Sequence, residues 1–386
     1  MIMKVFLLKV LTVVFVFNVL LSNASADQLQ LKKEKKEEIY QKIDTILNKL
    51  VKKDGIPGIA IGVSFADGSA YLKGYGKANL EFGINTEINT VFEIGSLTKT
   101  FTGVGILLLQ EEGKLDVSDH VSKYFPQFPN GEIITIKHLL QHTSGLKDVL
   151  KIEPYKSNRW RNWTPQEVMK MIESAPLEFD PGQRMKYSNS GCYVLGLIIE
   201  RVSGMSFENF MTERIAKPLG MKNTMLGNNS KIVKNSASSY ALSYYGNLYG
   251  ELKNAEYSSI SAAYASGGAI STVQDFVKLK KIFKPGVLLS EKSIKAMCSP
   301  TILNDGKISI QGDFLPESTF GYCLDMVKYN GHFIPGKSGS LSGFTSYFAY
   351  FPDSNTFIVI FCNRTGTSNQ LYRTVLSEIP SILKLK

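Results

Sequence analysis

Strand patterns stand at both ends of this chain and helical patterns fill its middle, and this order restricts the folds open to it. Four runs are rich in β-branched and aromatic residues: 59–65, 70–75, 344–351 and 356–361. Ala66-Asp67-Gly68 separates the first two and Pro352-Asp353-Ser354-Asn355 the last two, and both segments are typical of tight turns. We therefore expect both ends of the chain to belong to one antiparallel sheet.

Helical spacing of apolar residues dominates the region between the two pairs of strands. The expected helices cover 136–141, 164–174, 191–202, 206–215 and 272–283, and a further helical pattern covers 368–385. Thr164 precedes Pro165 and has Glu167 three residues later, which indicates a capped helix start.

The pattern as a whole predicts an α/β (α+β) fold, an antiparallel sheet with helices on both faces. We expect one domain over 51–385, with a sheet part at 51–114 and 301–385 and a helical insertion at 115–300. A cleft is expected where the two parts meet. The 386 residues, 44% of them hydrophobic, suffice for one large domain or two closely packed ones.

The first 26 residues have the pattern of a secretory signal peptide. Lys4 precedes an apolar run over 10–21, and Ala24-Ser25-Ala26 has the small residues that a signal peptidase accepts. An uncleaved anchor is the alternative, but Lys9 and Asn18 interrupt a span that needs roughly 20 apolar residues. We expect a periplasmic or secreted protein, with residues 27–50 as a charged lead-in and first helix.

Charge and cysteine content exclude several functions. The formal charge is +10, or +8 if Lys4 and Lys9 leave with the signal, and it is scattered rather than gathered in a basic block. We therefore expect no nucleic-acid partner, and a membrane contact only if the signal stays uncleaved.

The four cysteines are too irregularly spaced for a zinc knuckle or a redox pair. We expect buried free thiols. If two cysteines do pair, their strand-like segments favour Cys323 with Cys362.

The segment from Phe92 to Lys99 places a serine before an apolar helical run. If Ser96 starts that helix, Lys99 lies one turn further on the same face, within reach of the Ser96 hydroxyl. A serine hydroxyl becomes a good nucleophile only when a base takes its proton, and a lysine is such a base when its pKa is lowered. Taken alone, Ser96 would be a helix cap and Lys99 a surface lysine.

Two further segments carry matching chemistry. Tyr187-Ser188-Asn189 follows a turn, and a phenol beside a cation can relay protons while an asparagine amide can hold a substrate amide. Gly336-Lys337-Ser338-Gly339-Ser340 precedes the strand at 344–351, where a lysine and a hydroxyl suit a substrate carboxylate. Each of these segments by itself would be an ordinary structural loop. Together with the segment of Ser96 and Lys99, in this order and at these separations, they form a specific combination.

With these three segments the sequence resembles the serine β-lactamase and penicillin-binding protein family, over roughly residues 58–363. It is most similar to the branch of class C β-lactamases, D-alanyl-D-alanine carboxypeptidases and related esterases. Ser-X-X-Lys is present, while Tyr-Ser-Asn and Lys-Ser-Gly replace the Ser-Asp-Asn and Lys-Thr-Gly of related classes. Supporting matches are Leu140-Gln141-His142-Thr143-Ser144-Gly145-Leu146, Pro218-Leu219-Gly220-Met221 and Ser266-Gly267-Gly268.

The resemblance implies a role for each candidate residue. Ser96 would be acylated, and Lys99 and Tyr187 would move its proton. Asn189 would hold the substrate's side-chain amide, and Lys337 and Ser338 would face a substrate carboxylate.

The resemblance also implies that the backbone N–H groups of Ser96 and Ser340 hold the oxyanion. No cofactor is expected. His138 and His142 have the spacing of a helical zinc pair, but Leu139 stands where a metalloprotease needs glutamate and no third ligand is evident. We expect His142 to bond the turn around Ser144. No serine lies in a Gly-X-Ser-X-Gly elbow, which disfavours an α/β-hydrolase.

The resemblance implies a serine acyl-enzyme and a small-molecule or peptide substrate, namely a cell-wall peptide, a β-lactam or an ester. A D-alanyl-D-alanine carboxypeptidase or similar D-amino-acid peptidase is the leading interpretation. A class C-type β-lactamase, a carboxylesterase and a non-catalytic penicillin-binding sensor are the alternatives, because the same motifs serve all of them.

Overall fold

The computed structural model describes residues 34–245, 248–310 and 317–385. Residues 34–52 are helical, across the boundary between a first unit that ends at Asn48 and a second that begins at Lys49. The expected signal peptide at 1–26 lies outside the described residues. Among the helices that are described, none is both long and apolar enough to cross a membrane.

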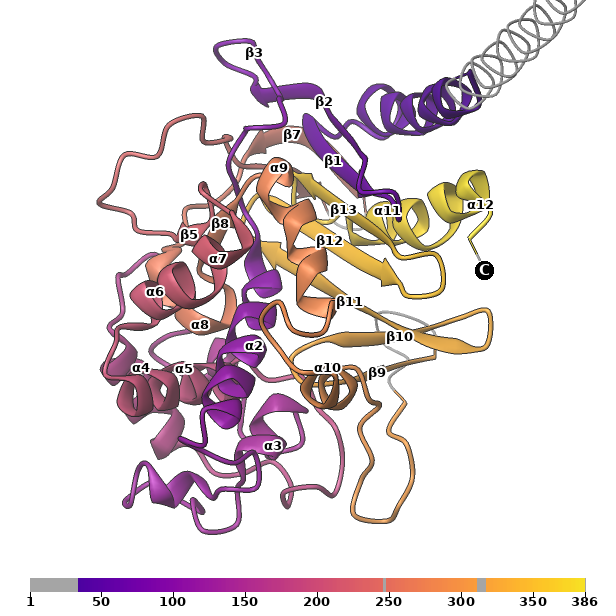
Figure 1. Cartoon of the computed structure of the whole chain (residues 1–386). Coiled ribbons are helices and arrows are strands. Elements are labelled where there is room, and N and C mark those ends of the chain that lie inside the picture. Colours follow the sequence, from indigo (N-terminus) through magenta and orange to yellow (C-terminus); the bar gives the residue numbers. More distant parts are fainter. Residues whose placement is uncertain (1–33, 246–247, 311–316, 386) are drawn as a thin grey trace, which may run out of the picture. The chain divides into compact units, whose positions relative to one another are not determined.

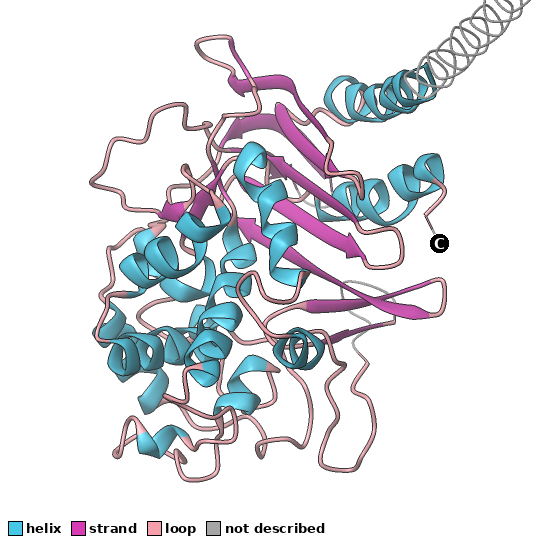
Figure 2. Ribbon diagram, in the orientation of Figure 1, coloured by secondary structure: helices cyan, strands magenta, loops and turns pink. Residues whose placement is uncertain are grey.

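An antiparallel sheet of eight strands forms the frame of the second unit, in the order β3-β2-β1-β13-β12-β11-β10-β9 (Figure 1). Its strands are β1 (Gly58–Ser64), β2 (Ala70–Asn79), β3 (Ile84–Asn85), β9 (Ser318–Phe320), β10 (Asp325–Tyr329), β11 (His332–Leu341), β12 (Phe344–Phe351) and β13 (Thr356–Cys362). Figure 2 shows these strands side by side, with helices around them.

The pairing of β1 with β13 joins the two ends of the chain, as the sequence predicts. Ile59 lies opposite Cys362, and Ser64 lies opposite Phe357. All seven residues of β13 are buried, which explains why its sequence is a continuous apolar run rather than an alternating one.

Helices cover both faces of this sheet, which confirms the predicted fold class. Phe348 and Tyr347 are neighbours in β12, so their side chains point to opposite faces. The Phe348 ring lies 5.7 Å from that of Phe276 in α9 (Val273–Phe276), whereas the Tyr347 ring lies 4.7 Å from that of Tyr372 in α11 (Ser368–Arg373). In Figure 1, α9 and α11 accordingly lie on the two sides of β12.

The described helical segments are short in most cases. The α-helices are α2 (Thr98–Glu111), α3 (Ile136–Leu140), α4 (Pro165–Ser174), α5 (Asn189–Ser203), α6 (Phe207–Phe210), α7 (Lys217–Leu219), α8 (Tyr264–Gly267), α9 (Val273–Phe276), α10 (Glu291–Met297), α11 (Ser368–Arg373) and α12 (Ile379–Leu383). Single 3-10 turns or runs are η1 (Gly95–Leu97), η2 (Val121–Lys123), η3 (Val149–Lys151), η5 (Ser261–Ala263) and η6 (Val277–Phe283), and π-helical turns are η4 (Met211–Ala216) and η7 (Thr374–Glu378).

The local signals of the sequence account for several of these helices. The Thr164 side chain accepts from the backbone N–H of Glu167, and the Glu167 side chain accepts from the Thr164 N–H, which is the predicted capping box of α4. Helix α5 begins at Asn189, two residues earlier than expected.

Several contacts cross the bounds of the expected helical insertion at 115–300. Helix α2 precedes it in the chain but packs against α5 and α8 within it, whereas α9 and η6 pack against β1 and β13 of the main sheet. Two small sheets complete the unit, β4 (Phe92–Glu93), β8 (Ala269–Ser271) and β5 (Met225–Leu226) in one, and β6 (Tyr240–Tyr245) with β7 (Leu248–Asn254) in the other.

The expectation of buried free thiols holds for three cysteines, whereas Cys298 is half-buried, and the pairing of Cys323 with Cys362 is wrong. All four cysteines are free. The Cys323 sulfur lies 4.0 Å from that of Cys192 instead, because Cys323 stands outside the strands, in a left-handed turn with φ of 58° before β10. Cys362 is the last residue of β13 and contacts the Thr367 hydroxyl at 3.0 Å.

Candidate active site

A sharp turn puts Ser96 at the start of α2. Gly95 has φ of +54°, a backbone conformation that favours glycine, and its carbonyl accepts from the Thr98 hydroxyl at 2.7 Å. The same hydroxyl accepts from the N–H of Ala269 at 2.9 Å, which ties the start of α2 to β8. Ser96 is thereby held at the entrance of the helix rather than within it.

Lys99 lies one turn after Ser96 and is fully buried. Its ammonium nitrogen is 3.1 Å from Ser96 Oγ, 2.7 Å from Asn189 Oδ1 and within hydrogen-bond distance of the Ser266 carbonyl. Burial lowers the pKa of Lys99 from 10.5 to about 8, and the nearby positive charge of Lys337 acts in the same direction.

The environment of Lys99 fits a neutral amine. Asn189 Oδ1 and the Ser266 carbonyl can accept the two hydrogens of such an amine, which leaves its lone pair for the Ser96 hydroxyl. The lowered pKa makes this neutral form accessible close to neutral pH.

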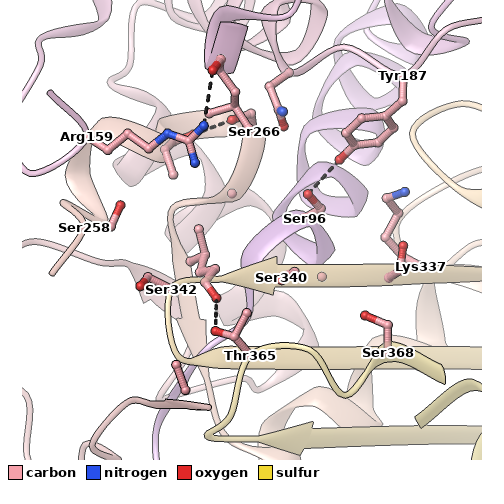
Figure 3. A pocket seen from close by; sticks show the side chains of 18 of the residues that line it. Ser96, Arg159, Tyr187, Ser258, Ser266, Lys337, Ser340, Ser342, Thr365 and Ser368 are labelled. Carbon is pink, nitrogen blue, oxygen red and sulfur yellow. Dashed lines mark hydrogen bonds between the residues drawn. The ribbon is translucent and has the colours of Figure 1, made fainter. Parts of the chain in front are cut away.

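Tyr187 reaches Ser96 from the other side. Its hydroxyl donates to Ser96 Oγ at 2.7 Å, and Figure 3 shows the two side chains pointing toward each other. Its ring packs against the imidazole of His142 at 4.6 Å and the ring of Phe320 at 5.9 Å. Burial raises the pKa of Tyr187 well above its usual value, so the phenol keeps its proton at neutral pH.

The Asn189 side chain is hydrogen-bonded to two other residues of the site in this structure. While its Oδ1 accepts from Lys99, its Nδ2 donates to both carboxylate oxygens of Asp148 at 3.2 Å. Asp148 was not singled out in the sequence, where nothing distinguishes it from the other acidic residues. It lies at the N-terminal end of η3, and its position next to Asn189 depends on tertiary packing alone.

His142 contributes a neutral packing surface. Its Nδ1 accepts from the N–H of Ser188 at 3.4 Å, so the expected bond to the turn around Ser144 is wrong. Burial lowers the pKa of His142 well below its usual value. His138 Nδ1 accepts from the N–H of Thr135 in a helix cap, and within the described residues no cluster of three metal-binding side chains occurs.

Strand β11 supplies the opposite wall of the site. Gly339 lies so close to the turn before Ser96 that a Cβ there would stand 2.2 Å from the Ile94 carbonyl oxygen. A Cβ on Gly95 would likewise stand 2.8 Å from the Ser340 nitrogen, so β11 passes close to the turn before Ser96 at this residue too. Ser340, one of the two residues expected to hold an oxyanion, therefore lies beside the residue that precedes Ser96.

Lys337 and Ser338 precede Gly339 in the same strand, and both bind an aspartate that the sequence analysis did not single out. Buried Asp325 forms an ion pair with Lys337, and its other oxygen accepts from the N–H of Ser338 at 2.8 Å and from the Ser338 hydroxyl at 3.0 Å. Asp325 is the first residue of a strand with an ordinary sequence. Its position beside Lys337 and Ser338 follows only from the strand register, which sets it opposite Gly336.

These walls enclose a cleft of about 680 Å³. Ser96, Tyr187 and Asn189 line it from the helical side, and residues 337–342 line it from β11 and the following turn. The cleft lies where the sheet and the helices meet, as the sequence predicts. It is large enough for an amino-acid derivative or a short peptide.

Residues 43–377 match the family model described as "Beta-lactamase". The chain belongs to this family. The family is one of serine hydrolases, in agreement with the resemblance stated from the motifs.

Relatives and solved structures extend this result. Protein flp of Staphylococcus aureus (strain MW2) is 38% identical over 208 residues, which are 52% of this chain and 41% of flp. Penicillin-binding protein 4* of Bacillus subtilis (strain 168) is 27% identical over 345 residues, 85% of this chain and 73% of that protein. The chain thus spans less than half the length of flp.

The solved structures include the D-amino acid amidase of Ochrobactrum anthropi SV3 in complex with L-phenylalanine amide. It superposes with a TM-score of 0.79 at 23% identity and covers 90% of this chain and 99% of the amidase. At this identity the likeness shows the fold alone.

Proposed function

We propose that the protein hydrolyses amide or ester bonds through an acyl-enzyme on Ser96, as a D-amino-acid peptidase or amidase. The observation that carries the proposal is that two side chains are hydrogen-bonded to Ser96 Oγ. The Lys99 Nζ lies 3.1 Å from this oxygen and the Tyr187 hydroxyl lies 2.7 Å from it. A nucleophile with a base and a second proton carrier on its oxygen is the arrangement that acyl transfer requires.

In the proposed acylation, Lys99 acts as the base. The neutral amine takes the Ser96 proton while Ser96 Oγ attacks the substrate carbonyl carbon. The Tyr187 phenol, which stays protonated, is the better candidate for delivering a proton to the leaving nitrogen or oxygen, and Lys99 returns a proton to it.

The tetrahedral oxyanion is held in this proposal by the N–H groups of Ser96 and Ser340. When the intermediate collapses, the amine or alcohol leaves and the acyl group stays on Ser96 as an ester. Water then attacks this ester with the same groups in reverse, which yields a carboxylic acid and the free serine. Losing one oxyanion donor costs about 3 kcal/mol of transition-state stabilisation in other serine hydrolases.

The substrate preference of this proposal comes from similarity. The fold neighbour is described as a D-amino acid amidase, and a relative that aligns over 85% of this chain is named a penicillin-binding protein. The leading activity is therefore hydrolysis next to a D-amino acid, and a β-lactamase or an esterase are the competing activities.

Time-resolved intact-mass spectrometry with a penicillin, together with turnover of D-alanine amide derivatives, tests the proposal. We expect turnover of the D-amino-acid derivative but not of its L-isomer. Penicillin turnover with release of penicilloate would favour a β-lactamase, and turnover of esters but not of the D-amino-acid derivative would favour an esterase. An adduct without turnover of any substrate would identify a sensor and contradict the proposal.

A further inference from the structure

A carboxylate of the chain itself stands where the sequence resemblance puts a substrate carboxylate. Asp325 is 5% exposed and lies at the first position of β10, opposite Gly336 in β11. Its two oxygens engage Lys337, the Ser338 N–H and the Ser338 hydroxyl. These are the same two residues that the resemblance assigns to the substrate.

The position of Asp325 follows from the sheet register. The pairing of β10 with β11 runs from His332 to Gly336, and beyond it the edge of β11 borders the cleft. N–H groups of alternate residues point to the same edge of a strand, so the N–H groups of Ser338 and Ser340 share this edge. Asp325 occupies the first of them and leaves the second, next to Ser96, for an oxyanion.

The two charged side chains of this subsite, Lys337 and Asp325, already neutralise each other. The Lys337 and Asp325 side chains are 1% and 7% exposed, so each charge is buried and the other is its main compensation. A substrate carboxylate would compete with Asp325 for one lysine and stand beside a second negative charge. Such a like-charge contact disfavours the ionised form of both groups.

We propose that Asp325 is a specificity-determining residue that closes the carboxylate subsite, so that the protein acts on amides and esters whose leaving group carries no carboxylate. This inference rests on the proposed function and narrows it. Amino-acid amides, peptide amides and neutral esters are substrates of the stated kind. Peptides that end in a free carboxylate next to the scissile bond are not.

Two matched esters test the inference. The probes are the N-acetyl-D-alanyl esters of glycolic acid and of glycolamide, whose leaving groups differ only in a carboxylate against a carboxamide. Wild-type protein should have a kcat/KM at least tenfold higher for the glycolamide ester. In Asp325→Asn and Asp325→Ala the ratio of glycolate to glycolamide kcat/KM should rise at least tenfold, because Lys337 and Ser338 become free for the substrate.

Asp275→Asn is the matched control. Asp275 is also a buried carboxylate, 2% exposed with Lys278 at 2.8 Å, but it does not line the cleft. Its loss should leave the ratio unchanged. Because the ratio compares two substrates in one sample, a smaller folded fraction in any variant does not alter it.

Two results overturn the inference while Ser96 still becomes acylated: faster hydrolysis of the glycolate ester by the wild type, or an unchanged ratio in both Asp325 variants. If neither ester acylates Ser96, the proposed function fails instead. Calorimetry with propionate then decides on the subsite alone. Propionate binding to Asp325→Ala but not to the wild type supports the inference, and equal binding or none to either protein contradicts it.

Discussion

The Tyr187 hydroxyl donates a 2.7 Å hydrogen bond to Ser96 Oγ, although the two residues are 91 positions apart in the chain. Lys99 reaches the same oxygen at 3.1 Å from within helix α2. Of these two groups, only Lys99 has its pKa moved toward neutrality, to about 8, since burial moves the pKa of Tyr187 upward. Lys99 is therefore the base in the proposed mechanism, and this assignment gives the first prediction a direction.

The rate of acylation should rise with pH through about pH 8. Raising the pH removes the proton from Lys99, and only the neutral amine can accept the proton of Ser96. Below pH 8, kcat/KM should climb about tenfold per pH unit, as expected for one ionisation, and level off above it. A pH profile between 6 and 9.5 measures this. A flat or falling profile over that range would argue against Lys99 as the base.

The effects of removing Lys99 and Tyr187 should not multiply. Lys99→Ala and Tyr187→Phe should each slow acylation by about a hundredfold or more. The double variant should be little slower than either single one, because the two groups form one relay in which Lys99 takes the Ser96 proton and Tyr187 delivers one to the leaving group. Tyr350→Phe serves as control, since the Tyr350 hydroxyl contacts Asn355 and does not line the cleft. A double variant whose loss is the product of the two single losses would show that the residues act independently.

The frame of the fold could be predicted because its signals are local. The hairpin of β1 and β2 and that of β12 and β13 follow from strand-like runs with a turn between them, and the capping box at Thr164 marks the start of α4. The packing of the middle region could not be predicted in this way. Helix α2 and η6 contact partners far away in sequence, and local periodicity carries no information on such contacts.

The same distinction holds for the candidate site. The spacing of Ser96 and Lys99 predicts their contact directly, because residues three apart lie on the same face of a helix. The contact of Asp325 with Lys337 depends on the register between β10 and β11, which a one-residue slip would abolish. The neighbours of Cys323 likewise depend on a single left-handed residue before β10.

Gly339→Ala should lower the acylation rate on the order of hundredfold. The added Cβ would stand 2.2 Å from the Ile94 carbonyl oxygen and 2.3 Å from Ser346 Oγ, two atoms that are themselves hydrogen-bonded to each other at 2.8 Å. Strand β11 must therefore shift, and the Ser340 N–H shifts with it, which weakens the proposed oxyanion site. Single-turnover kinetics measure the rate, and circular dichroism checks the fold. A folded variant with the full rate would contradict this geometry.

The native protein should begin at or near Asp27 and be found outside the cytoplasm. Lys4, the apolar run and Ala24-Ser25-Ala26 provide a positively charged region, an apolar region and a cleavage site in the order of an export signal. N-terminal sequencing of protein from fractionated cells tests both statements. Cytoplasmic material with Met1 intact would refute them.

The identity of the acylated residue tests the central claim most directly. After reaction with an activated D-alanyl ester, tandem mass spectrometry of the digested protein should locate the acyl group on Ser96. Ser96→Ala should form no adduct, while Ser342→Ala, which removes another hydroxyl lining the cleft, should form it as the wild type does. An adduct on a different serine, or full hydrolytic activity in Ser96→Ala, would contradict the account.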